Sequence, residues 1–159
     1  MGSFCLTEPD AGSDAAGCKT TAIWNGKEYI LNGLKCFITN GPLADYTAVY
    51  ALTEPEKKAK GLSCFVVKKG TPGFSVGKIE DKMGIRSAQV SEMILENVRV
   101  PKENMIVESG QGFKLAMKTL DGGRIGVAAQ GLGIAEGAFE IAKEYLKTRE
   151  QFGKPLYRN

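Results

Sequence analysis

A hydroxyl, a carboxylate and a proline lie together near the start of the chain, at residues 7–9 (Thr-Glu-Pro), and a second polar segment follows at 12–14 (Gly-Ser-Asp). Proline fixes the path of a loop, and such a loop can present the hydroxyls of Thr7 and Ser13 to a bound molecule. An ordinary surface turn has the same composition, because Pro, Asp, Gly and Ser are common in turns. The spacing alone leaves a ligand-binding loop and a surface turn both open.

Some kinds of chemistry are excluded by the residue types. The chain has no histidine, so Ser–His and Cys–His nucleophile pairs are ruled out, and zinc is left only scattered thiolates and carboxylates. Any proton transfer must fall to a carboxylate, lysine, tyrosine or cysteine side chain. The cysteines form no C-x-x-C pair, and we expect them to be reduced, buried thiols of a cytoplasmic or organellar protein. They are Cys5, Cys18, Cys36 and Cys64.

The composition is that of a globular protein. At 159 residues, 43% hydrophobic and 25% charged, the chain is long enough for one domain, or for one domain and part of a neighbour. No run of eighteen apolar residues occurs, so we expect no membrane-spanning segment. The net charge of +3 is too small to indicate nucleic-acid binding, and we expect the lysine cluster at 57–60 to be a solvated loop.

Short β-rich runs separated by turn residues fill the first two thirds of the chain. Asn25-Gly26 and Asn32-Gly33 both predict chain reversals, the first of them in a hairpin where Trp24 is expected to be a packing residue. Many short strands at regular spacing predict a small barrel or sandwich. The expected strands are 20–24, 29–31, 35–39, 46–52, 62–67, 74–76 and 92–100.

From residue 112 to 149 the apolar residues recur three and four apart, which predicts a helix. Glycine weakens a helix interior by about 1 kcal/mol relative to alanine, so the segment 121–123 (Asp-Gly-Gly) predicts a bend or break. The segment 131–137 (GLGIAEG) looks like a dinucleotide-binding fingerprint, but its third glycine is one place late and no strand precedes it. The amphipathic helix has no partner within the chain, and we therefore expect a truncated protein.

Six segments, in this order, resemble the acyl-CoA dehydrogenase family. The family signature L-[ST]-E-P-x-x-G-S-D is present in full at residues 6–14. The others are 37–40 (FITN), 81–86 (DKMGIR), 100–104 (VPKEN), 121–124 (DGGR) and 149–153 (REQFG). The resemblance covers nearly the whole chain. It implies a mainly β fold with a C-terminal α part, in which the family's middle β-barrel or two-sheet domain (1–105) leads into a truncated helical bundle (106–159).

The resemblance also implies that the protein binds FAD. The Thr7 hydroxyl is expected near the N1/O2 edge of the flavin, where a donor stabilises the anion that forms on reduction, and the Thr39 hydroxyl near N5. Taken alone, Thr39 could equally be a strand residue packed on a neighbour. Phe37 stands where many relatives carry tryptophan. The implied FAD-binding residues are Phe4, Cys5, Leu6, Thr7, Gly12, Ser13, Phe37, Ile38, Thr39, Arg149, Gln151 and Phe152.

Family members oxidise an acyl-CoA thioester to the trans-2-enoyl-CoA: a glutamate removes the α proton, and hydride passes from Cβ to flavin N5. The residues implied to bind substrate are Ser13, Asp121, Gly122, Gly123 and Arg124. Asp121 and Arg124 could instead pair with each other on a helix. In a few members the glutamate precedes the arginine of D-x-x-R, where this chain has Gly123. We therefore expect no catalytic residue in this chain, a base beyond Asn159, and an inactive fragment.

The implied partners follow from the same resemblance. Arg149 resembles the arginine that family members lend to the FAD of a neighbouring subunit, although a solvated helix-end arginine is the simpler alternative. A homo-oligomer, a tetramer when full length, and an electron-transferring flavoprotein are therefore expected. The D-G-G-R version, with Phe37, is most like butyryl-type short-chain enzymes. A bacterial cytoplasm or the mitochondrial matrix is the expected location, and a non-catalytic scaffold or an acyl-CoA oxidase are the alternatives.

Overall fold

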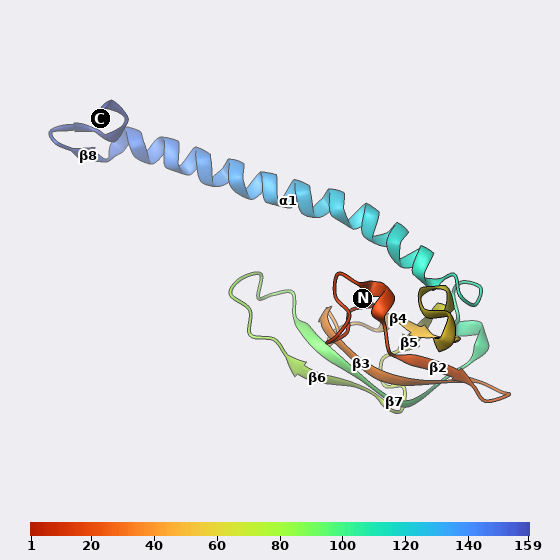
Figure 1. The fold of residues 1–159 in the computed structure, drawn as a ribbon. Coiled ribbons are helices and arrows are strands. Elements are labelled where there is room, and N and C mark those ends of the chain that lie inside the picture. Colours follow the sequence, from red (N-terminus) through yellow and green to blue (C-terminus); the bar gives the residue numbers. More distant parts are fainter. The chain divides into compact units, whose positions relative to one another are not determined.

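The computed structural model describes residues 1–159, which form two compact units, Met1–Met117 and Lys118–Asn159. The first unit is mainly β (Figure 1). Its strands are β1 (Gly2–Cys5), β2 (Thr21–Trp24), β3 (Tyr29–Thr39), β4 (Tyr46–Leu52), β5 (Leu62–Lys68), β6 (Phe74–Ile79) and β7 (Val90–Val100). Three short 3-10 segments, η1 (Ala15–Gly17), η2 (Pro55–Gly61) and η3 (Lys102–Asn104), connect them. The predicted mainly β fold with a C-terminal helix is confirmed.

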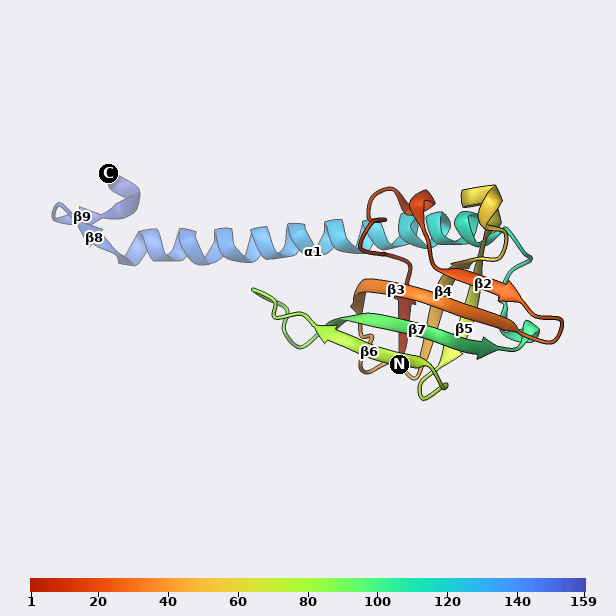
Figure 2. The same ribbon diagram turned by 60° about the horizontal axis from the view of Figure 1, so that its bottom comes forward.

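The seven strands form one strongly branched sheet in the order β1-β4-β2-β3-β7-β6, with β5 paired to β4. In the turned view of Figure 2, β3, β7 and β6 run side by side, and both of their pairings are antiparallel. The β2–β3 hairpin turns at the predicted Asn25-Gly26, and the Trp24 ring packs on Tyr29 with centroids 5.0 Å apart. Trp24 is therefore a packing residue, as predicted.

The second predicted reversal, at Asn32-Gly33, is wrong. β3 continues through these residues as one eleven-residue strand, and only its register against β7 shifts between Leu31 and Gly33. The cause is a long-range bond: the Asn32 side-chain oxygen accepts a hydrogen bond of 2.8 Å from the backbone N–H of Asn97, which has a φ of 52°. The irregularity is therefore a β-bulge that bends the strand, rather than a turn that ends it.

β1 was not predicted as a strand, and it pairs in parallel with β4 from Gly2↔Tyr46 to Cys5↔Val49. Its four residues include glycine and serine, which carry little local preference for a strand. Its conformation is instead stabilised by the neighbouring β4, which is also the partner of β5 over seven residue pairs. The N-terminal segment therefore enters the sheet before it reaches the loop at residues 6–14.

The core of the first unit is mainly aliphatic and includes the thiol of Cys5. All four cysteines are free and buried, as predicted. Twelve fully enclosed residues form the main cluster: Cys5, Ala22, Leu31, Ile38, Val49, Ala51, Phe65, Val67, Met93, Leu95, Val98 and Val100. Burial of this kind supplies most of the stabilisation of a small β domain.

We expect these thiols to be unreactive in the native protein. Burial raises the pKa of Cys5 to about 12 and those of Cys18 and Cys64 to about 11, so almost no thiolate exists at pH 8. A thiol–disulfide exchange reagent at pH 8 should modify none of the four cysteines within minutes, and all four after denaturation in guanidinium chloride. Rapid stoichiometric labelling of the native protein would contradict the burial described here.

Helix α1 (Gly112–Thr148) runs for 37 residues and includes most of the second unit. The predicted break at residues 121–123 is wrong, because the glycine pair lies inside the continuous helix; its cost is offset by the many helix-favouring residues on both sides. The glycine-rich segment 131–137 is also helical, which agrees with the rejection of a dinucleotide fingerprint. None of the helices combines the length and apolarity needed to span a membrane.

After α1, the second unit ends in a small hairpin of β8 (Glu150–Gln151) and β9 (Lys154–Pro155), followed by η4 (Leu156–Arg158). Phe152 and Gly153 form the hairpin turn with φ values of 53° and 73°. A hydrogen bond of 2.8 Å from the backbone N–H of Leu156 to the carbonyl of Arg149 closes the open end of the hairpin, and the backbone N–H of Arg149 donates to the Tyr145 carbonyl in α1 at 2.9 Å.

Candidate functional site

The loop at residues 6–14 is a tight turn with a buried base. Glu8 and Ala11 exchange two backbone hydrogen bonds of 3.1 Å, which leaves Pro9 and Asp10 exposed at the tip. The side chain of Glu8 does not point to solvent with them, since the residue is only 5% exposed. A surface turn alone does not bury a carboxylate, so this segment has a further structural purpose.

Four hydrogen bonds saturate the Glu8 carboxylate. Its Oε1 atom accepts from Cys18 Sγ at 2.9 Å, from the Thr20 backbone N–H at 3.0 Å and from Lys35 Nζ at 2.8 Å. Its Oε2 atom accepts from the Lys19 backbone N–H at 2.7 Å. Burial by itself raises the pKa of Glu8, but the Lys35 ammonium and these hydrogen bonds outweigh it and hold the pKa at about 2. Glu8 is therefore a fixed anion.

Two neighbouring residues of β3 bind the loop. Lys35 is fully buried, and its Nζ donates to the Leu6 carbonyl at 2.9 Å as well as to Glu8. The backbone N–H of Cys36 donates to the Thr7 carbonyl at 3.0 Å. Three consecutive loop residues are thus attached to two consecutive strand residues.

A second bulge in β3 turns the next side chains outward. The register against β7 shifts between Lys35↔Met93 and Ile38↔Ser91, and Phe37 within the bulge has a φ of 55°. Positive φ is unfavourable for an aromatic residue, so the surrounding pairing must enforce it. As a result Phe37 is 65% exposed, and Thr39 beyond it is exposed as well.

These groups fit a planar ring that has hydrogen-bonding edges. The hydroxyls of Thr7 and Thr39 have no hydrogen-bond partner within the chain, so both can donate to a ligand. Phe37 offers an exposed aromatic surface two residues from Thr39 on the same strand. An isoalloxazine ring needs such a surface and donors of this kind, so the residues present are compatible with FAD.

The other predicted flavin contacts of the first unit differ in exposure. Cys5, Leu6 and Ile38 are buried in the core, so only their backbone atoms could reach a ligand. Phe4 is half-buried and packs on Tyr50 at 5.0 Å. Gly12 and Ser13 are exposed, and a Cβ atom added at Gly12 would meet nothing within 4 Å. Gly12 and Ser13, which follow the tight turn, are therefore accessible to solvent.

The remaining predicted residues belong to the second unit. Asp121, Gly122, Gly123 and Arg124 occupy one exposed turn of α1. Asp121 and Arg124 form no ion pair with each other, which removes the alternative that they serve only to pair. Arg149, Gln151 and Phe152 lie in or beside the β8–β9 hairpin, and all three are exposed.

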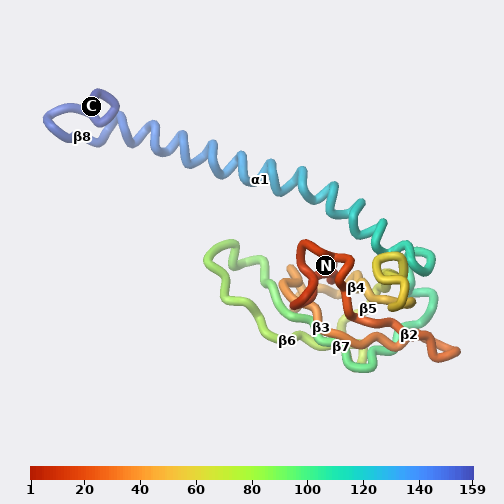
Figure 3. Tube along the Cα trace, in the orientation of Figure 1, coloured from red at the N-terminus to blue at the C-terminus, as the bar shows by residue number.

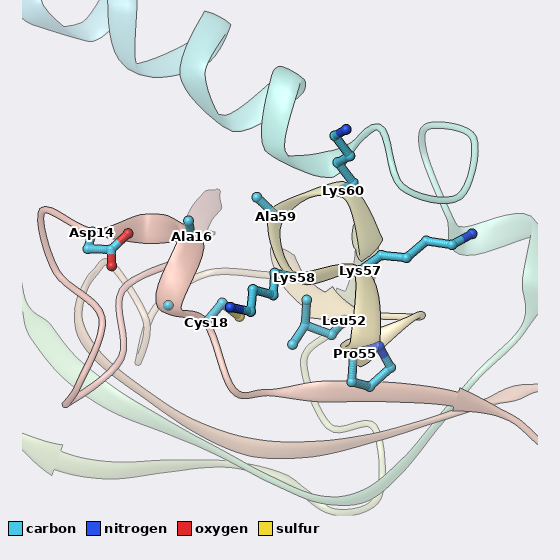
Figure 4. A pocket seen from close by; sticks show the side chains of 10 residues that line it. Asp14, Ala16, Cys18, Leu52, Pro55, Lys57, Lys58, Ala59 and Lys60 are labelled. Carbon is cyan, nitrogen blue, oxygen red and sulfur yellow. The ribbon is translucent and has the colours of Figure 1, made fainter.

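A pocket of about 590 Å³ lies between η1 and η2, directly after the polar loop. Figure 3 shows the N-terminal loop and the η2 segment beside each other. In the close-up of Figure 4 the Lys58 side chain extends toward Cys18, whereas Lys57 points away from it. Lys57 pairs with Glu54. The lysine cluster at 57–60, which was expected to be a solvated loop, therefore borders a pocket. Lys58 and Lys60 on its rim have no carboxylate partner.

The Glu8–Lys35 pair was not predicted from the sequence. Glu8 was noticed only as part of a motif, and Lys35 only as part of a strand. The available signal was a lysine among apolar residues in a predicted strand, since a charged residue at an inward position requires a partner. Nothing in the spacing of 27 residues identifies that partner.

Comparison with known proteins identifies the family of this chain. Residues 3–98 match the family model described as acyl-CoA dehydrogenase, middle domain, and residues 110–159 match acyl-CoA dehydrogenase, C-terminal domain. The chain is similar to acryloyl-CoA reductase (NADH) of Anaerotignum propionicum, with 54% identity over 158 residues that cover 98% of this chain and 40% of that protein.

Two solved structures are similarly close. Butyryl-CoA dehydrogenase from Megasphaera elsdenii is 57% identical, with a TM-score of 0.95 over 98% of this chain and 41% of that chain. A chain in the structure of the electron transferring flavoprotein of Acidaminococcus fermentans is 55% identical, with a TM-score of 0.94 over 99% of this chain and 42% of that chain. This chain spans about two fifths of the length of these relatives. Since the middle-domain model alone matches over half of the chain, it belongs to the acyl-CoA dehydrogenase family.

Proposed function

We propose that this chain forms the flavin- and acyl-CoA-facing part of a FAD-dependent acyl-CoA dehydrogenase, which oxidises an acyl-CoA thioester to the trans-2-enoyl-CoA. The observation that carries the proposal is the pair of hydroxyls without a partner in the chain, Thr7 and Thr39, together with the exposed Phe37 ring. The loop that carries Thr7 is bonded to the strand that carries the other two residues. Family membership supplies the class of cofactor.

Bound FAD supplies the hydride acceptor for the reaction. Thr7 and Thr39 hold the ring by donating hydrogen bonds to its polar edges, and Phe37 covers part of its surface and excludes water. Phe4, Gly12 and Ser13 line the same side of the site through backbone or side-chain contacts, together with the backbones of Cys5, Leu6 and Ile38. These residues bind and orient; none of them transfers a proton.

The catalytic base is proposed to lie outside this chain. Glu8 is the only carboxylate buried beside Thr7, but its oxygens are occupied by four hydrogen bonds and its pKa is held at about 2. Such a group cannot remove a weakly acidic α proton efficiently. At the helical position where a few relatives carry the glutamate, this chain has Gly123.

The substrate and partner assignments rest on the relatives. The 57% identity to butyryl-CoA dehydrogenase from Megasphaera elsdenii supports a short acyl chain, bordered by Ser13 and by residues 121–124. The lysine-rimmed pocket between η1 and η2 is suited to phosphate groups of coenzyme A. Similarity to a chain in the Acidaminococcus fermentans electron transferring flavoprotein structure supports a flavoprotein as the electron acceptor. Arg149, Gln151 and Phe152 are proposed to reach the FAD of a neighbouring subunit in a homo-oligomer.

The test uses the complete gene product that contains this chain. Purified with FAD and mixed with butyryl-CoA without air, it should lose the visible absorbance of the oxidised flavin. No loss of absorbance with any acyl-CoA would contradict the proposal. Release of hydrogen peroxide under air would identify an oxidase instead.

Replacing Thr39 by valine should lower the rate of flavin reduction by about tenfold, because one donor to the ring is lost without a change in side-chain volume. The matched control is Thr21→Val on β2, which alters a strand threonine paired with Asn32 rather than with the bulge at Phe37. Its rate should equal that of the unaltered protein. Stopped-flow absorbance under anaerobic conditions measures both. Equal rates for the two variants would remove Thr39 from the site.

A further inference from the structure

The buried ion pair of Glu8 and Lys35 needs an explanation other than the stability of the sheet. Both side chains are almost completely enclosed, at 4% and 0% exposure, and their charged atoms lie 2.8 Å apart. Taking two charges out of water is costly, and replacing such pairs by apolar residues is often neutral or stabilising. A buried ion pair in a core of aliphatic residues is therefore weak as a device for stability alone.

Lys35 binds the residues on both sides of Thr7. Lys35 Nζ binds the carbonyl of Leu6, directly before Thr7, and the carboxylate of Glu8, directly after it. The Thr7 carbonyl itself is bound by the backbone N–H of Cys36. Thr7 is thus held on three sides, while its hydroxyl has no partner within the chain.

Lys35 and Cys36 also lie next to the other proposed flavin contacts of this strand. Lys35 and Cys36 immediately precede the bulge at Phe37, and the bulge turns Phe37 and Thr39 to the exposed face. The bonds of Lys35 and Cys36 therefore connect the Thr7 loop directly to the strand that carries Thr39. A shift of a few tenths of an ångström at Lys35 changes the geometry of one donor relative to the other.

We propose that Lys35, together with Glu8, is a positioning residue for the flavin, which acts by fixing the Thr7 hydroxyl relative to Phe37 and Thr39. This inference rests on the proposed function, because it assumes that FAD binds at this face. Lys35 does not touch the cofactor. Its effect on bound FAD passes through Thr7.

The experiment measures the midpoint potential and visible absorption spectrum of FAD in the complete gene product. Thr7→Val removes the donor directly, and we expect it to lower the potential by about 30 mV, which is a tenfold change for a two-electron couple. Lys35→Met should shift the potential in the same direction, with a matching change in the flavin spectrum. The double variant should shift it no further than Thr7→Val alone, because both changes remove the same interaction.

The matched control is Val98→Ala, which makes a cavity in the core of the same unit and is expected to leave the potential unchanged although the protein is less stable. If Lys35→Met does not fold, Glu8→Gln takes its place, because it keeps the side-chain shape and one acceptor oxygen while it removes the charge. Shifts of Lys35→Met and Thr7→Val that add in the double variant would overturn the proposal. An unchanged potential in both Lys35→Met and Glu8→Gln would overturn it as well.

Failure of the proposed function is distinguishable from failure of this inference. If the unaltered protein binds no FAD, the proposed function is wrong, and the variants need not be made. If the unaltered protein binds FAD and Thr7→Val shifts its potential while Lys35→Met and Glu8→Gln do not, only the positioning role is wrong. Circular dichroism of each variant at the assay temperature shows that the folded protein is being compared.

Discussion

Replacing Gly73 by alanine should destabilise the first unit by more than about 3 kcal/mol, enough to remove much of the stability of a typical domain. Gly73 has a φ of 81°, which is unfavourable for any residue with a Cβ atom. The added Cβ would also lie 2.1 Å from the Glu96 carbonyl oxygen. The backbone N–H of Glu96 binds the Gly73 carbonyl at 2.9 Å, so the clash falls on the pairing that begins β6. Chemical denaturation of the purified chain measures the loss.

Gly70 is the matched control for this prediction. It lies in the same β5–β6 connection and has a φ of 82°, but a Cβ atom there would meet nothing within 4 Å. Gly70→Ala carries only the cost of the left-handed backbone, about 1–2 kcal/mol. The two variants therefore separate backbone strain from steric overlap. Equal losses of stability in the two variants would show that the close approach of Gly73 to Glu96 does not exist in solution.

The Glu8 carboxylate should make the stability of the protein depend on acid in a defined range. Its pKa in the folded protein is about 2, below the ordinary value of 4.5. A group with a lowered folded pKa contributes its stabilisation above the unfolded pKa and loses it as the pH falls through the folded pKa. The contribution of Glu8, on the order of 3 kcal/mol, should therefore be complete above about pH 4.5 and disappear as the pH falls toward 2.

Carboxylates in general change charge in this pH range. The quantity to measure is therefore the difference in unfolding free energy between two proteins. Free energies of unfolding are determined from pH 6 to 2 for the unaltered chain and for Glu8→Gln, which cannot titrate at this position. The unaltered chain should be more stable at pH 6, and the gap should narrow as the pH falls below 4.5. Cys18, which donates to Glu8, stays protonated over this range because its pKa is raised to about 11. Parallel curves for the two proteins would assign the acid dependence to other groups.

Much of the fold follows from local patterns in the sequence. The strand at 46–52 was predicted with its observed bounds, and the Asn25-Gly26 hairpin and the helix after residue 112 were also predicted. Alternation of apolar residues, turn residues and the helical period are properties of neighbouring positions, so they need no tertiary information. The family motifs likewise identified the segments that carry Thr7 and Thr39.

The errors share one physical cause. Asn32-Gly33 has the composition of a turn, yet its outcome is decided by a bond to Asn97, 65 positions away. The break expected at Gly122-Gly123 depended on a local propensity of about 1 kcal/mol, which a long helix can offset. β1 has little strand preference of its own and is stabilised by β4. In each case a long-range contact or a longer element prevailed over the local signal.

The candidate site, like the fold, could be predicted from the sequence only in part. Residue types and spacing, with the family resemblance, predicted that the loop at 6–14 and the segment at 37–40 belong to a site for a flavin, and this assignment remains a proposal. Only the tertiary structure shows that Glu8 is a buried anion rather than a ligand or base, and that Lys35 is its partner. The reason is that charge burial and β-bulges depend on strand register, which is set by pairing between distant segments. The polar loop that first indicated chemistry therefore has a structural part, the buried Glu8, beside the Thr7 hydroxyl that is proposed to bind the ligand.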